Sequence, residues 1–325
     1  TTLDLITSNL TIKQAGFTSL VPKWEFAHKD PKHSDWFSLK INRINLYNID
    51  FSKLFRESHF MADSLLLKGV RLENFKNTQI PIEHNVMPMI YTVIQQLPIK
   101  FAFQTARVEG MDVVYEELPQ QEETPGRISI TQLNGVFEDY TNIVSQSKQT
   151  TTLYATGKLM GEGKLRATVV LPVDPAYDRV TIEASLGVMD MIALNPIIES
   201  MAPVSIKGGF IQGMDLRIEA DSTQSKVRMK LLYNDLAVNI TQKIDNHHKA
   251  NLGILSFFAN GLIENDNPKA GEEVRIVDAV HIRDPLHSSF NYLWKTIFDA
   301  LVKVLGYTDN RQEAVSTLMT VSSEQ

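Results

Sequence analysis

Residues 161 to 164, with the sequence Gly-Glu-Gly-Lys, combine glycine and lysine in the way that phosphate-binding loops do. A P-loop has four residues between its two glycines and a Ser or Thr after the lysine. Here one residue separates the glycines, and Leu165 follows Lys164. The spacing therefore predicts a hairpin turn between two strands, not a nucleotide site.

Histidines form two groupings that could be considered as metal ligands, His247 with His248 and His281 with His287. A structural zinc site needs four converging ligands, and a catalytic site usually needs three. The chain contains no cysteine and no His-Glu-x-x-His helix. Because polar residues flank the first pair, we expect it in a solvated turn, and we expect His281 on a partly exposed strand position. We expect no metal site.

Two acid pairs, Glu116-Glu117 and Glu122-Glu123, could be imagined as hydrolytic carboxylates. They lie in or beside a polar stretch that ends in Thr-Pro-Gly, and nothing in their spacing fixes a separation suited to glycoside hydrolysis. No Gly-x-Ser-x-Gly elbow and no dinucleotide glycine fingerprint occurs. We therefore expect a protein that is not an enzyme and uses no cofactor.

The 325 residues are 43% hydrophobic, so the chain can bury a sizeable core. A formal net charge of −6 disfavours a nucleic-acid partner, because such proteins usually carry a concentrated basic face. The chain begins at Thr1, and we expect that a signal or a membrane anchor precedes it. The most apolar stretch, residues 286 to 305, holds Lys295, Asp299 and Lys303, so we do not expect it to span a bilayer.

Between residues 163 and 186, apolar and polar residues alternate over two adjoining segments that Pro172 and Pro175 separate, which predicts antiparallel strands with one apolar face. The same period returns on both sides of residue 222. We therefore predict a mainly β fold built on a large, curled antiparallel sheet with a few helices, shaped as a groove. The apolar residues expected to line the groove are Leu165, Val169, Ile182, Leu186, Met214, Leu216, Val227, Met229 and Leu231.

A short pattern recurs in which Asn or Gly stands between apolar positions, at Asn48, Gly69, Gly110 and, in part, Gly135. Asn and Gly tolerate positive φ, so each copy predicts a bend or bulge within a strand. A structural repeat and a coincidence in a β-rich chain are both open from the pattern alone.

Three helices are expected, near 83–97, at 189–201 and at 288–305. The third begins after Ser288 or Ser289, ends before Gly306 and carries an apolar stripe. That stripe could lie on a membrane or dock a partner, but we favour packing on the sheet of the same chain. We expect residues 1–285 to form the groove domain and residues 286–325 a helical tail that caps it. The capping residues are Phe290, Leu293, Trp294, Ile297, Phe298 and Leu301.

The order of several short motifs resembles the C-terminal region of the AsmA-like family of cell-envelope proteins, in its Bacteroidetes form. The resemblance covers residues 36 to 308. The motifs are Gly161 to Pro172 (GEGKLRATVVLP), Leu194 to Pro196 (LNP), Gly208-Gly209, Tyr233 to Leu236 (YNDL), Leu255 to Asn260 (LSFFAN) followed by Asn267-Pro268, and Phe290 to Lys295 (FNYLWK).

The resemblance implies a Gram-negative protein anchored in the inner membrane through an N-terminal segment, with its bulk in the periplasm. It also implies a role in outer-membrane biogenesis, or in phospholipid transfer between membranes along a hydrophobic β groove. The ligands would be phospholipid acyl chains, and the partners envelope proteins. The alternative is a structural module of the envelope that binds protein partners along its edge strands and holds no lipid.

Overall fold

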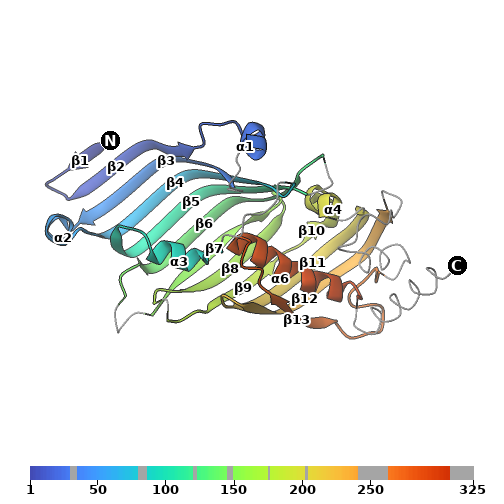
Figure 1. Cartoon of the computed structure of the whole chain (residues 1–325). Helices are drawn as coiled ribbons and strands as arrows, with labels where there is room; N and C mark the ends of the chain where they lie inside the picture. The colour runs from blue at the N-terminus through green and yellow to red at the C-terminus, as the bar shows by residue number, and fades with distance from the viewer. Residues whose placement is uncertain are drawn as a thin grey trace.

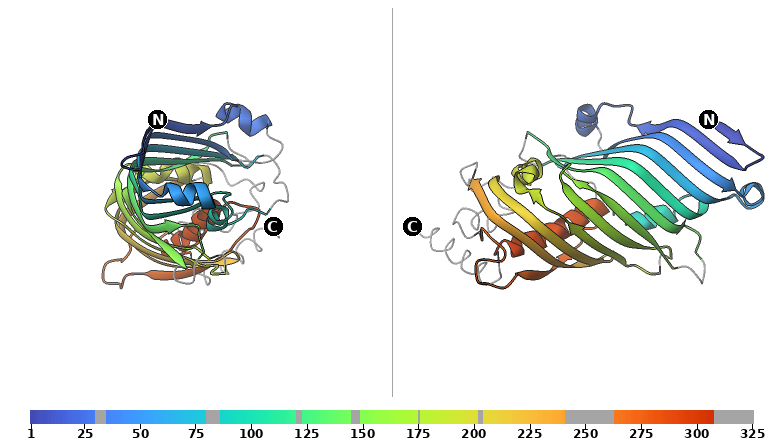
Figure 2. Two further views of the ribbon diagram at one scale, coloured as in Figure 1. Left: turned by 90° about the vertical axis from the view of Figure 1, so that its left-hand side faces the viewer. Right: turned by 180° about the vertical axis from the view of Figure 1, so that it is seen from behind.

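One open sheet of 13 strands dominates the computed structural model, which describes residues 1–29, 35–79, 86–119, 123–144, 149–174, 176–201, 204–240 and 263–307. The sheet curls around helices that lie on its concave side, as the end-on view of Figure 2 shows. The fold class predicted from the sequence is confirmed. Glu122, the pair His247-His248 and the tail beyond Tyr307 lie outside the described residues.

The strands follow one another in the sheet almost entirely in chain order (Figure 1). They are β1 Thr2–Asp4, β2 Asn9–Thr18, β3 Trp36–Ile49, β4 His59–Asn77, β5 Lys100–Leu118, β6 Gly126–Thr141, β7 Thr150–Leu159, β8 Gly163–Pro172, β9 Val180–Leu186, β10 Met189–Asp190, β11 Val204–Ala220, β12 Gln224–Ile240 and β13 Ile276–Ile282. The short β10 pairs beside β11, off the main path. One neighbouring pair, β4 with β5, is parallel, so the sheet is mixed where we expected an antiparallel one.

The helices are α1 Lys23–Lys29, α2 Phe51–Glu57, α3 Ile90–Gln95, α4 Asn195–Met201, the 3-10 helix η1 Met191–Leu194 and α6 Ser289–Val304. Helices α3 and α6 lie against the inner face in Figure 1. None of the described helices is long and apolar enough to cross a bilayer.

Two predicted helices differ from the observed ones. Of the helix expected near 83–97, the described residues 86–97 contain only the six residues of α3, because Met89 is extended at its N-cap and Pro88 disfavours a helical Met87 before it. The segment 189–201, expected as one helix, begins as β10, continues as η1 and is α-helical only from Asn195. Pro196 is in the first turn of α4, where a proline is tolerated. The helix expected at 288–305 is confirmed as α6, with the Ser288 hydroxyl accepting from the backbone N–H of Asn291.

Bends occur inside the strands at most of the expected positions. Asn48, Gly69 and Gly110 have φ values of 55°, 60° and 65°, which confirms the predicted bends at these residues. On β6 positive φ values fall on Gln132 and Asp139 instead of Gly135. Each such residue interrupts the alternation of faces, so apolar side chains on both sides of it can point to the same face.

Apolar residues line up across the whole sheet. Directly opposed partners in neighbouring strands share a face. One row takes a residue from each of the strands on the main path: Leu3, Leu10, Leu46, Leu65, Ala106, Phe137, Leu153, Val169, Ile182, Ile218, Val227 and Ala279. The next row is Ile12, Ile44, Leu67, Val108, Gly135, Ala155, Ala167, Ala184, Leu216, Met229 and Val277. We call the face that carries these rows the inner face.

Candidate functional site

A cavity of about 360 Å³ lies between α6 and the inner face. We call it the chamber. Strands β5 to β9, β11 and β12 form its floor, η1 and α4 form one side, and α6 forms its roof. Ligand pockets of proteins commonly have volumes of about 300 to 1,000 Å³, so the chamber falls within the range of binding sites.

Most residues that the sequence predicted for the groove come together in this chamber. Eight of them line it: Leu165, Val169, Ile182, Leu186, Met214, Leu216, Met229 and Leu231. All six predicted capping residues line it as well, namely Phe290, Leu293, Trp294, Ile297, Phe298 and Leu301. Val227 does not; it is 2% exposed and packs in the core cluster around Ile218 and Ala279.

Among the described residues that line the chamber, none is Asp, Glu, Lys, Arg or His. Apart from the Tyr115 hydroxyl, the Trp294 ring N–H and the Ser129 hydroxyl, its side chains are hydrocarbon or thioether. An unbonded polar group would lose its hydrogen bonds to water in such a space, whereas an apolar group gains by leaving water. The chamber is therefore suited to a hydrocarbon chain.

A ring pair stands where the chamber meets the N-terminus of α6. The rings of Tyr115 on β5 and Phe290 on α6 have centroids 4.3 Å apart. The Tyr115 hydroxyl donates to Oε2 of Glu117. Burial, with the Glu117 carboxylate beside it, raises the pKa of Tyr115 well above its ordinary value.

A small pocket, of about 40 Å³, adjoins this end of the chamber. Tyr115, Ile128, Ile197, Phe290 and Trp294 line both spaces. The pocket adds polar groups that the chamber lacks, from Glu117, Ser200, Asn291 and Lys295. A long apolar space thus ends at a group of hydrogen-bonding side chains.

Three polar contacts hold α6 over the sheet. The hydroxyl oxygens of Ser225 on β12 and Thr296 on α6 lie 2.6 Å apart in a buried setting. Nδ1 of His281 on β13 lies 2.7 Å from Oδ2 of Asp299. Arg275 donates from Nη1 to the Val304 carbonyl oxygen at 2.6 Å, near the end of the helix. The roof of the chamber is therefore attached to the sheet from Thr296 to Val304.

The sequence did not assign β5 and β6 to the lining, although Val113, Tyr115, Ile128 and Ile130 contribute to it. Their signal was present as apolar residues two positions apart on each strand. Alternation alone does not show which residues of β5 and β6 face the chamber, because Gly110 on β5 and Gln132 on β6 shift the alternation partway along these strands.

The remaining chemical candidates lie in ordinary structural settings. Gly161 forms the turn between β7 and β8, as the spacing predicted. Glu116 is paired with Lys23 and lies 3.4 Å from Nη1 of Arg127. His281 is on β13 and partly exposed, which confirms that prediction. Among the described residues, no group of three or more His, Cys, Asp or Glu side chains could hold a metal ion.

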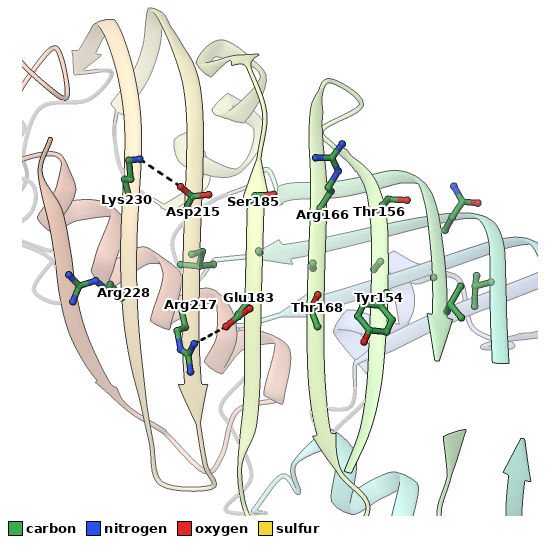
Figure 3. A pocket seen from close by; sticks show the side chains of 18 of the residues that line it. Tyr154, Thr156, Arg166, Thr168, Glu183, Ser185, Asp215, Arg217, Arg228 and Lys230 are labelled. Atoms are coloured by element: carbon green, nitrogen blue, oxygen red, sulfur yellow. Dashed lines mark hydrogen bonds and ion pairs between the residues drawn. The ribbon is translucent and has the colours of Figure 1, made fainter. Parts of the chain in front are cut away.

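A second hollow, of about 1150 Å³, lies on the opposite face of the sheet (Figure 3). We call it the outer dish. Small residues such as Thr156, Thr168 and Ser185 lie between longer charged ones. Arg217 pairs with Glu183 at 2.8 Å, and Lys230 lies 3.9 Å from Asp215. Exposed pairs of this kind are typical of a solvated sheet face.

No family model and no curated protein matches the chain.

Proposed function

We propose that this chain is a non-enzymatic protein of the cell envelope that binds lipid acyl chains along the inner face of its sheet. The observation that carries the proposal is the chamber, an apolar space under α6 at one end of a face whose apolar rows cross the sheet. The resemblance to AsmA-like proteins supports a place on the periplasmic side of the inner membrane and a role in outer-membrane biogenesis or phospholipid transfer. An N-terminal anchor would hold the protein there.

The inner face also offers apolar surface outside the chamber. Val113 and Ile130 line the chamber and lie opposite each other on β5 and β6. The same row continues through Leu72 on β4 to Leu39 on β3, and these two strands do not line the chamber. Leu39 and Leu72 are only partly buried. Because the hydrophobic effect is proportional to the apolar area removed from water, an acyl chain could lie across these strands and continue into the chamber.

Native mass spectrometry of the protein extracted from its host tests this proposal. We expect phospholipid to remain bound. Leu67→Asp places a carboxylate in an inner row and should reduce the bound lipid, because a charge in an apolar site must be desolvated. The matched control is Leu66→Asp, one residue away on the other face, where Leu66 is opposite Arg107. A protein that stays free of lipid, or equal effects of the two variants, would contradict the proposal.

A second candidate function is a module that binds protein partners along β13, the last strand of the sheet. Ile276, Val280 and Ile282 are 46%, 55% and 68% exposed on this strand, although they point to the otherwise polar face. Edge strands with exposed apolar residues can pair with a strand of another protein. Replacing Val280 and Ile282 by Lys should abolish co-purification of such a partner and leave bound lipid unchanged.

A further inference from the structure

We propose that the chamber takes a single acyl chain and that Lys295 holds the anionic head of that ligand. The ligand class is thus a one-chain amphiphile with a carboxylate or phosphate head, or one of the two chains of a larger lipid. This inference rests on the proposed function and makes it specific to one site, one chain and one charge.

The volume of the chamber sets the number of chains. A water molecule has a share of liquid volume of about 30 Å³, and a methylene group is of similar size, so 360 Å³ holds on the order of twelve methylene groups. This is the length of one medium acyl chain. The two chains of a membrane phospholipid do not fit together while α6 is fixed by Thr296 and Asp299.

The small pocket marks the end of the chamber at which the head lies. It is continuous with the chamber through Tyr115, Phe290 and Trp294. Lys295, one turn after Asn291 on α6, is exposed at this pocket, and in the described part of the chain its ammonium group makes no ion pair. The nearby carboxylate of Glu117 accepts a hydrogen bond from Tyr115. The ammonium group of Lys295 would attract an anionic head, and the Glu117 carboxylate in the same pocket would partly oppose that attraction.

The opposite end of the chamber is apolar, and its side chains pack in the core. Leu305, Leu236 and Val238 line it there, and Leu305 is 7% exposed. The Leu305 carbonyl oxygen accepts from the backbone N–H of Glu264 at 3.0 Å, which anchors this end. A chain whose head lies beside Tyr115 therefore extends along α6 toward Leu305, and we infer that its contacts with the chamber end there.

A chain-length series on the unmodified protein tests the number of methylene groups. We would measure the affinity of saturated fatty acids from eight to eighteen carbons by calorimetry, each below its micelle concentration. Binding should tighten about fourfold for each added methylene, since burying one contributes about 0.8 kcal/mol, and should stop tightening near twelve to fourteen carbons. The expected stoichiometry is one. A constant gain up to eighteen carbons, or two fatty acids per chain, would overturn the inference.

Two matched pairs of variants test the site. Ala167→Phe fills the chamber and should weaken dodecanoate binding at least about tenfold, because its ring occupies the volume that the chain needs. Thr168→Phe adds the same ring on the outer dish and should leave the affinity unchanged.

The second pair tests the head group. Lys295→Gln should weaken the binding of dodecanoate and of dodecyl phosphate about fivefold, but not the binding of dodecylamine. Lys303→Gln on the same helix should change none of these affinities. Thermal unfolding of each variant identifies any that fails to fold.

The outcomes separate this inference from the proposed function. If phospholipid binds but dodecanoate does not, the chamber has another occupant, such as part of the chain outside the described residues, and only the inference is overturned. The same holds if Ala167→Phe and Thr168→Phe bind dodecanoate equally well. If neither phospholipid nor fatty acid binds, both proposals are wrong.

Discussion

Nδ1 of His281, on the last strand of the sheet, lies 2.7 Å from Oδ2 of Asp299 in the middle of α6. The contact joins α6 to β13, the last strand of the sheet in the described part of the chain. The two side chains are 21% and 39% exposed, so solvent screens their attraction. A double-mutant cycle with His281→Ala and Asp299→Ala should give a coupling free energy of about 0.2 to 1 kcal/mol in urea unfolding. No measurable coupling would mean that this contact does not fasten the helix.

Thr296→Val, on the side of α6 that faces the sheet, should lower the free energy of unfolding more than loss of the His281–Asp299 contact. Valine has nearly the same shape as threonine but no hydroxyl group. Thr296 and Ser225 are each 1% exposed, and their hydroxyl oxygens lie 2.6 Å apart. In the valine variant, the Ser225 hydroxyl loses the Thr296 hydroxyl and keeps only a long hydrogen bond, of 3.5 Å, to the His281 carbonyl oxygen. The free energy of unfolding should fall by about 1 to 3 kcal/mol, the cost of a buried polar group without a good partner.

The control for this change is Thr156→Val on the exposed outer side of β7, where the hydroxyl is already in water. It should change the free energy of unfolding by less than about 0.5 kcal/mol. Equal losses at positions 156 and 296 would show that the buried hydroxyl pair contributes nothing to the attachment of α6. Denaturation in urea, followed by circular dichroism, measures both variants.

Local pattern was enough to predict much of this fold. A period of two over residues 163 to 186 sets strand type and face at once, because successive side chains on a strand point to opposite sides. The stripe of α6 and its Ser288 cap were equally local signals. Eight of the nine predicted groove residues line the chamber for this reason. Val227 shares their face but packs in the core with Ala279 of β13, a pairing that no local pattern reveals.

Features that depend on distant parts of the chain were not predicted. The parallel pairing of β4 with β5 is set by where the chain returns after α3, and antiparallel and parallel strands have the same alternation. The contribution of β5 and β6 to the chamber depends on the bulges at Gly110 and Gln132. The division of the chain at residue 285 stays a prediction.

Gly69 and Gly110 allow a test of the recurring bends, because they have nearly the same φ in different surroundings. A Cβ on Gly110 would have no atom within 4 Å, so Gly110→Ala should cost only the strain of a left-handed residue, roughly 1 to 2 kcal/mol. A Cβ on Gly69 would lie 2.4 Å from Nδ2 of Asn42. Gly69→Ala should therefore lower the midpoint of urea unfolding more than Gly110→Ala does.

Asparagine at the same two positions provides the control, because it tolerates positive φ better than alanine does. Gly110→Asn should be closer to the wild-type protein than Gly110→Ala. If all substitutions at these glycines have no effect on stability, the bends do not need the conformational freedom of glycine.

His287, in the turn that leads into α6, gives the protein a predictable dependence on pH. Burial lowers the pKa of His287, and the Lys76 ammonium group lowers it further, while the Asp284 carboxylate, 3.0 Å from Nδ1, opposes them. The neutral imidazole is therefore favoured in the folded state. As the pH falls through the ordinary histidine pKa of about 6.5, the unfolded chain takes up a proton that the folded chain does not, and stability decreases until the lowered pKa is reached.

His287→Gln should remove this part of the acid-induced loss, so the urea midpoint of the variant should change less between pH 7.5 and pH 5.5 than that of the wild-type protein. Asp284→Asn should increase the change in the urea midpoint over this pH range, because the Asp284 carboxylate is the group that most favours the protonated imidazole. Carboxylates with ordinary pKa values stay ionised over this range, so they add little to the difference. Identical pH profiles for the wild-type protein and both variants would show that His287 is not held neutral by its burial beside the cap helix.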